Sequence, residues 1–442
     1  MVRFFVVGFT VGMVALAADS STTPVTFSKD VARIFQEKCN ECHRPGTAAP
    51  MSLESYDQAR PWARSIKQRV LTHQMPPWSI DKSVGIQQFS NDRSLSDEQI
   101  ATIVRWVDTG APMGDVKDMP PAQQWPSDQA WLLQKEFGRP PDLVIKSDPY
   151  TMPARSQDQW WKPLADVPVT EPRWVRAVEM RPGTVEGRKI THHALAHLVQ
   201  DDPEAMRLGS DSGDGQGGVL MEWAVGKNFD IYREGTGKLL MPGSHIWWDI
   251  HYHAVGEEIR DHVELGVWLY PKGQEPKYRT YLTAFNATAS SGAALDIAPN
   301  SIAVSQGFHV LKQAARLENF QPHMHLRGKA MLLEAILPDG TTQTISYVGN
   351  FDFNWMTNYI YSDDAAPVLP KGTIIHVTAW HDNTAENRGN PDPNQWVGWG
   401  DRTVDEMAHA WVNVTYISDD DYNAWAAQHK PARNAASSRI SQ

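Results

Sequence analysis

The sequence is poor in cysteine, because its 442 residues include only Cys39 and Cys42. Two cysteines three positions apart cannot cross-link distant parts of a fold, so a disulfide framework is excluded as the main source of stability. If both sulfurs serve one nearby function, no thiolate remains for a blue-copper or other cysteine-ligated centre. Histidine and methionine are then the only soft metal ligands in the rest of the chain.

Basic runs and long apolar runs are also missing. The chain carries 41 Lys and Arg against 52 Asp and Glu, a formal net charge of −11. Nucleic acid and anionic membrane surfaces attract proteins through concentrated positive charge, so neither is expected as the main partner. Beyond the N-terminus no segment reaches the roughly 18 consecutive apolar residues of a membrane span, so none is expected.

The first residues have the pattern of a secretory signal peptide. A basic start is followed by the apolar stretch from Phe4 to Ala17, which ends in Ala15-Leu16-Ala17. This A-x-A ending predicts cleavage after residue 17 and a mature chain that starts at Ala18 or Asp19. We therefore expect an exported protein.

The two cysteines lie in Cys39-Asn40-Glu41-Cys42-His43, a C-x-x-C-H motif. This motif attaches a c-type haem through two thioethers and supplies His43 as an iron ligand. A thioredoxin-like C-x-x-C needs a βαβ setting, and a zinc site needs a second ligand pair nearby. Neither is present, so we predict one covalent haem c and, for an exported haem protein, a bacterial periplasm.

Helical patterns flank this motif. Apolar residues from Val31 to Phe35 recur at helical spacing before Cys39, and Ser96-x-x-Gln99 is a capping box that begins a second helix ending at Gly110. Residues 19–117 thus resemble a monohaem cytochrome c domain. The resemblance implies a methionine as the sixth iron ligand, and Met75, followed by Pro76-Pro77, fits the family's Met-Pro loop. Met51, His73 and Met113 compete for this role.

The remainder predicts β structure. A Pro-rich linker at 118–140 precedes short strand-like runs separated by Gly, Pro, Asn and Asp. These runs predict two sandwiches, at 141–271 and 272–418, followed by a tail at 419–442. The expected fold class is therefore multidomain, with a small all-α cytochrome c domain followed by two all-β jelly-roll-like sandwiches.

Histidines gather at four places on these predicted strands. Residues two apart on a strand share a face, so His323 and His325 can hold one metal. Adjacent His192 and His193 would point to opposite faces unless the strand is kinked or ends there. The remaining candidates are His251 and Met407. Imidazole with thioether ligation favours copper that cycles through Cu(I).

These residues resemble the two-copper ascorbate-dependent monooxygenases, the group of peptidylglycine α-hydroxylating monooxygenase and dopamine β-monooxygenase. The resemblance covers roughly residues 141–417 and keeps the chain order of the ligands. It implies an electron-relay copper on His192, His193 and His251. It also implies a catalytic copper on His323, His325 and Met407, where O₂ is activated and a C–H bond is hydroxylated. Two copper ions, O₂ and a small organic substrate are then expected.

The chain departs from this family where peptide-processing members bind a substrate carboxylate. The matching positions hold Gln321, His409 and Trp411. A carboxylate clamp is therefore missing, and His409 and Trp411, on the Met407 face, are expected to line a more apolar or aromatic pocket. Asp249, two residues from His251, is a candidate to orient that imidazole.

Fusion to a haem segment suggests that a soluble or membrane-bound donor delivers electrons through the haem to the relay copper. Two alternatives stay open. The sandwiches could bind copper and transfer electrons without oxygenase activity. Alternatively, the His323 cluster alone could hold one iron or zinc ion of an oxygenase or hydrolase, although the carboxylate of a facial triad is missing there.

Overall fold

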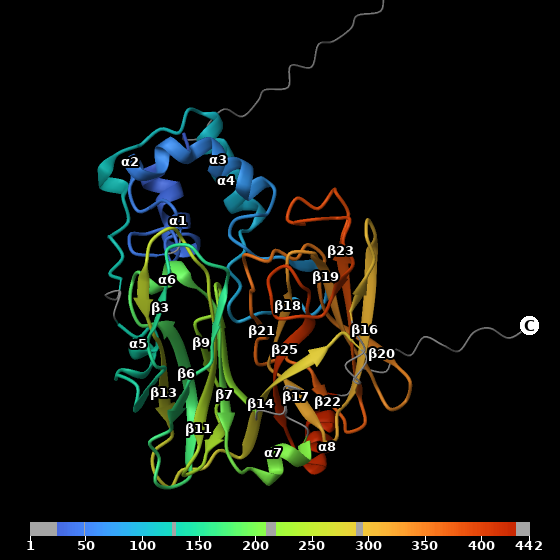
Figure 1. Ribbon diagram of the computed structural model, residues 1–442. Helices are drawn as coiled ribbons and strands as arrows, with labels where there is room; N and C mark the ends of the chain where they lie inside the picture. Colours follow the sequence, from blue (N-terminus) through green and yellow to red (C-terminus); the bar gives the residue numbers. More distant parts are fainter. Residues whose placement is uncertain (1–23, 48, 126–129, 209–217, 289–294, 430–442) are drawn as a thin grey trace, which may run out of the picture.

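The computed structural model describes residues 24–47, 49–125, 130–208, 218–288 and 295–429. The signal peptide predicted for residues 1–17 lies outside these ranges, as does the tail beyond residue 429. Two β units lie side by side, and a helical N-terminal segment covers one end of the first unit (Figure 1).

Short helices around a small core form the N-terminal segment. They are η1 (Phe27–Val31), α1 (Ala32–Lys38), α2 (Tyr56–Ala59), η2 (Arg60–Trp62), α3 (Ala63–Leu71), α4 (Asp97–Asp108) and η3 (Val116–Asp118). Ser96 and Gln99 form the capping box that begins α4. Phe27, Phe35 and Trp106 are fully buried and pack edge-on or tilted against one another.

The prediction of an all-α N-terminal domain is wrong. Strand β1 (Ile80–Gly85) lies within this segment and pairs with β20 (Thr342–Val348) of the second β unit. Trp78 and Ile80 belong to the core of that unit rather than to the core of the helices. The alternation of apolar and polar residues that predicts a strand is missing around residue 80. The strand forms because its residues are buried against distant strands, which outweighs the local pattern.

The predicted linker is docked on the first β unit. It contains α5 (Leu133–Phe137), and Trp131 and Leu133 pack with the fully buried Trp268. The carboxylate of Glu179 accepts hydrogen bonds from the backbone N–H groups of Leu132 and Leu133, each at 2.9 Å. These groups are the free donors at the start of the helix, so the contact both caps and anchors α5.

The first β unit is largely antiparallel. Its elements are β2 (Leu143–Lys146), β3 (Tyr150–Met152), β4 (Gln159–Trp161), β5 (Leu164–Asp166), β6 (Arg173–Pro182), α6 (Gly187–Ile190), β7 (Thr191–Val199), α7 (Pro203–Leu208), β8 (Gly218–Ala224), β9 (Phe229–Ile231), β10 (Thr236–Leu240), β11 (His245–Tyr252), β12 (Ile259–Asp261) and β13 (Val263–Leu269). Strands β2, β13, β6 and β10 lie on one side of the core, and β8, β7, β11 and β4 lie on the other. Every residue of β13 is buried.

The second β unit also consists of two layers of strands that face each other across a core. Its elements are β14 (Tyr278–Asn286), β15 (Asp296–Ile297), β16 (Ile302–Val310), β17 (Ala315–Leu317), β18 (Asn319–Met324), β19 (Gly328–Ile336), β20, β21 (Tyr359–Ile360), β22 (Val368–Leu369), β23 (Ile374–Asp382), β24 (Val397–Gly398), β25 (Ala408–Tyr416) and α8 (Asp419–Gln428). A five-stranded sheet in the order β1-β20-β19-β23-β16 faces β14, β17, β18 and β25 across the core. Strand β14 pairs with β8 and β10 as well as with β25, so hydrogen bonds join the two units.

Within the described ranges, no helix has the length and apolar character needed to cross a lipid bilayer.

Candidate metal centre

The first group of histidines is formed by His192, His193 and His251, called here the histidine triad. In the antiparallel pairing of β7 with β11, His251 lies opposite His193 and Tyr252 lies opposite Thr191. His192 is therefore an extra residue, a β-bulge that turns its side chain toward those of its neighbours. This bulge supplies the local kink that ligation by two adjacent histidines requires.

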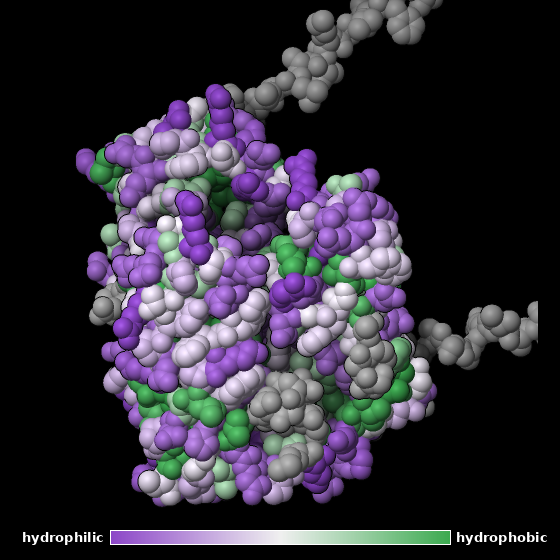
Figure 2. Space-filling model, in the orientation of Figure 1, coloured by the Kyte–Doolittle hydropathy of each residue, from purple (hydrophilic) through white to green (hydrophobic). Residues whose placement is uncertain are grey.

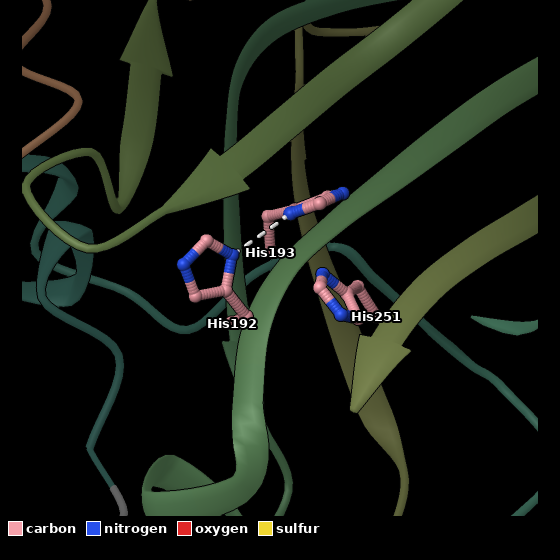
Figure 3. Close-up of side chains that lie close together, drawn as sticks. All are labelled: His192, His193 and His251. Atoms are coloured by element: carbon pink, nitrogen blue, oxygen red, sulfur yellow. Dashed lines mark hydrogen bonds between the residues drawn. The ribbon is translucent and has the colours of Figure 1, made fainter. Parts of the chain in front are cut away.

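The three imidazoles of the triad converge. One ring nitrogen of each lies within 4.8 Å of the others, and the Nδ1 atoms of His192 and His193 are 3.1 Å apart. Figure 3 shows the rings around a common space between β7 and β11. Ligand atoms held about 2.0–2.1 Å from one metal lie roughly 3–4 Å apart, so small side-chain rotations would complete the site.

Asp158 orients His251. Its Oδ2 lies 2.9 Å from His251 Nε2, while its Oδ1 accepts from His253 Nδ1 at 2.7 Å. This leaves His251 Nδ1 buried, with no hydrogen-bond partner among the described residues. Asp249 does not fill the orienting role that the sequence suggested, because its carboxylate pairs with Lys162 at 2.9 Å.

Burial keeps the triad uncharged. Desolvation, reinforced by the neighbouring histidines, lowers the pKa of His192 to about 4 and that of His193 well below its usual value. Burial also lowers the pKa of His251, although Asp158 partly opposes this shift. Neutral imidazoles present the lone pairs that metal ions bind.

The second group consists of His323 at the end of β18 and His325 just after it, called here the histidine pair. Their ring centroids are 5.6 Å apart. His325 Nδ1 lies 3.1 Å from the backbone oxygen of Asp405, which leaves Nε2 as the ligand atom. Burial lowers the pKa of His325 to about 4 and that of His323 well below its usual value. His323 Nδ1 is buried and has no partner in the part of the chain that the structure describes.

Met407 directly precedes β25, the strand that pairs with β18. The preceding residue, Glu406, holds this part of the chain against the segment after β18. Its carboxylate accepts hydrogen bonds from the backbone N–H groups of His325 at 2.9 Å and Arg327 at 2.6 Å. The backbone oxygen of Met407 lies 3.1 Å from Nε2 of the fully buried His381. The backbone of Met407 is thus held beside the histidine pair.

The triad and the pair face each other across the boundary between the β units. The ring centroids of His193 and His323 are 6.1 Å apart. Phe353 lies between the groups, stacked on His192 at 4.8 Å and edge-on to His325 at 6.1 Å. The pattern of ligand residues gave no sign of Phe353 or Asp158, because both come from loops distant in sequence.

His409 and Trp411 lie on the same side of β25 as the pair, but they are packed rather than open. His409 stacks on His323 at 4.5 Å, and burial lowers its pKa to about 3. Trp411 packs with Val219 of the first unit. Gln321 donates from Nε2 to the buried Glu222 at 2.8 Å. The more apolar or aromatic pocket expected here is therefore filled by side chains and a buried polar contact.

The C-x-x-C-H segment follows α1. Neither cysteine forms a disulfide, and both are half-buried. Burial, together with the nearby Cys42, raises the pKa of the Cys39 thiol to about 12. Such thiols are poor nucleophiles and poor thiolate ligands, which disfavours a redox or zinc role. His43 Nδ1 lies 3.2 Å from the backbone oxygen of Met51, so Nε2 remains available. Figure 2 shows an apolar hollow below the helices of this segment.

The candidates for the sixth iron ligand lie at different places. Met75 is half-buried in the segment after α3, with its backbone N–H 3.3 Å from the oxygen of Arg69. Met51 packs against the helical core beside Cys39, whereas His73 and Met113 are exposed. The choice of Met75 stays a prediction.

The C-x-x-C-H segment touches the first β unit close to the triad. Arg188 on α6 donates to the backbone oxygen of Gly46 at 2.9 Å, and His192 follows this helix by two residues. A cavity of about 190 Å³ lies at the junction, between Cys42, Trp223 and Trp355. Phe353, which contacts the triad, belongs to the same loop as Trp355.

Comparison with known proteins identifies no relative. No protein-family model and no curated protein matches the chain. Among solved structures, the major capsid protein P2 of bacteriophage PM2 has a TM-score of 0.27 at 10% identity, covering 62% of this chain and 97% of that one. Broad bean stain virus gives a TM-score of 0.23 at 9% identity, covering 55% and 75%. Likeness this low carries no argument about function.

Proposed function

We propose that the protein is a copper-dependent monooxygenase that hydroxylates a C–H bond of a small organic substrate with O₂. The observation that carries this proposal is the convergence of the triad and the pair, which come from different β units, on one buried site. The buried Nδ1 atoms of His251 and His323 lack hydrogen-bond partners within the described ranges. A metal ion at each histidine group would satisfy these atoms.

Copper suits these donors better than other metals. The triad offers three neutral imidazoles, the pair offers two, and Met407 adds a thioether that favours Cu(I). When bound, copper supplies the one-electron chemistry needed to use O₂. No described carboxylate belongs to either ligand group, since Asp158 contacts the far side of His251 and both oxygens of Glu406 accept backbone N–H groups.

The protein's own residues would position and shield the reaction. Asp158 and the backbone oxygen of Asp405 fix the planes of His251 and His325, so each ring presents one nitrogen to the site. Phe353 excludes water between the groups. The 6.1 Å between the rings of His193 and His323 gives electrons a short path from the triad to the pair.

We further propose that a haem attached at Cys39 and Cys42, with His43 on its iron, supplies the electrons. The support is the hydrogen bond that fixes His43, together with the contact between Gly46 and Arg188 beside the triad. Export to the periplasm, where c-type haem is attached, belongs to the same proposal.

Metal and haem quantitation combined with O₂ uptake tests this function. We expect two copper ions and one haem per mature chain, and about one copper ion with no substrate-dependent O₂ uptake in His323→Ala. His309→Ala is the matched control, because His309 lies on β16 and contacts neither histidine group. One metal ion per chain would refute the proposal. Two coppers without O₂ uptake would instead favour a copper-binding electron-transfer protein.

The haem route has its own test. After the protein is reduced and mixed with O₂ and substrate, the haem absorption band should shift to its oxidised form as copper turns over. A haem that stays reduced during turnover would exclude it as the donor.

A further inference from the structure

A second cavity lies between the β units, away from both histidine groups. Its volume is about 380 Å³, within the range of small-molecule binding sites. Its walls come from β9 of the first unit and from β18, β21 and β25 of the second, near the middle of Figure 1. Ser90 of the N-terminal segment also contributes.

The cavity has a charged rim, and most of the side chains on its floor are neutral and polar. Exposed Arg176, Glu234 and Asp363 lie at the rim. The floor is lined by buried amide and hydroxyl side chains, namely those of Thr236, Thr280, Asn319, Asn358 and Asn413. Such side chains both donate and accept hydrogen bonds, so they suit a neutral polar ligand.

One polar atom of the lining, Oδ1 of Asn413, has neither a hydrogen-bond partner nor an ion-pair partner within the described residues. Asn413 is only 6% exposed. Single atoms of Asp230, Arg233 and Glu318 also lack hydrogen bonds, but they lie in ion pairs: Asp230 Oδ2 is 3.3 Å from Lys227 Nζ, and Arg233 Nε is 4.0 Å from Glu318 Oε1. Leaving a buried polar atom unpaired is unfavourable, so a bound molecule that donates a hydrogen bond to Asn413 is favoured.

The charges around the cavity are already compensated. Asp230 lies 3.3 Å from Lys227, and Glu318 lies 3.0 Å from Arg316. A charged ligand would add a buried charge without a partner, which is unfavourable. Hydroxyl groups match the unpaired Asn413 oxygen and the amide and hydroxyl side chains around it, because each hydroxyl can donate and accept.

We propose that this interdomain cavity binds a neutral, hydroxyl-rich small molecule of the sugar or polyol class. Asn319 of the cavity lining lies four residues before His323 on β18, a separation of roughly 13 Å along the strand. This site goes beyond the proposed function, since none of its residues belongs to a histidine group and its test requires neither copper nor haem.

Ligand-observed saturation-transfer NMR on the full mature chain tests the site. D-glucose, D-mannitol and myo-inositol serve as neutral probes, and putrescine and citrate serve as charged probes. We expect saturation of at least one neutral probe and of neither charged probe. Absence of transfer to all three neutral probes, or transfer to a charged probe alone, would overturn the proposal.

Two variants locate the binding. Asn413→Leu removes a floor acceptor, and Ser362→Trp fills the cavity from its wall without changing a buried strand. Each should weaken binding of the neutral probe at least tenfold, whereas Ser83→Trp on the exposed part of β1 should not. Circular dichroism verifies folding, so Ser362→Trp stays informative if Asn413→Leu does not fold. Unchanged affinity in a folded Ser362→Trp variant would place the probe elsewhere and refute the proposal.

Discussion

Single residues decide how the triad is held. Asp158 contacts His251 and His253, and it also accepts a bond from Thr403 of the second β unit at 3.3 Å. Burial opposes ionisation of Asp158, but the hydrogen bonds from His253 and His251 outweigh it and keep the pKa of Asp158 below its usual value. One ionised carboxylate therefore orients a triad ring and links the two units.

Asp158→Asn should weaken metal binding at the triad about 10- to 100-fold, because the orienting acceptor is lost. Isothermal titration of the metal-free protein with copper measures this change. Asp249→Asn is the matched control, since Asp249 pairs with Lys162 instead. Equal weakening by both substitutions would show that general charge, rather than orientation, is responsible.

The sequence predicts the position of His192 in this site but not the role of Asp158. The bulge at His192 was foreseeable, because two adjacent ligands on a strand require one. The choice of Asp158 over Asp249 was not, since Asp158 precedes β4 and lies 93 positions from His251. Period-two logic placed Asp249 near His251 but could not show Lys162 beside it.

At the level of elements, β1 joins the helical segment to the second β unit. Trp78 and Ile80 are 6% and 5% exposed, and Trp78 packs edge-on against Tyr359 at 4.8 Å. The capping box of α4 was readable from sequence, because it is a local pattern. The strand was not, because its burial depends on β20, more than 250 residues away.

Trp78→Ala should lower the free energy of unfolding of the second β unit by about 3–5 kcal/mol, the usual effect of truncating a buried tryptophan. Urea titration followed by circular dichroism in the β region measures it. The exposed Trp62 of η2 provides the control, and Trp62→Ala should change stability little. If Trp78→Ala left unfolding of the β units unchanged, the helical segment would be energetically independent of them.

For the whole molecule, the buried histidines link stability to pH. His192 and His325 have pKa values lowered to about 4, mainly by burial, whereas histidines in the unfolded chain titrate near 6.5. Between these values the unfolded chain binds more protons, so stability is complete above about pH 6.5 and falls as the pH drops toward 4.

The metal-free protein should therefore lose about 1.4 kcal/mol per pH unit for each such histidine below pH 6.5. Urea unfolding at pH 7.5, 6.0 and 5.0 tests this expectation. His192→Asn should reduce the slope, since one titrating ring is removed. A midpoint that does not move between pH 7.5 and 5.0 would contradict the assignment of neutral buried rings.

The N-terminal segment is fixed to both β units, through Arg188 and Gly46 on one side and through β1 on the other. Strand β14 also pairs with strands of both units. The N-terminal segment and β14 therefore both connect the two β units across their boundary. A hinged opening of the two units would have to break one of these attachments. A molecule that reaches the histidines with these attachments intact must therefore pass by local movement of loops, such as the one that carries Phe353 and Trp355, rather than by separation of the two units.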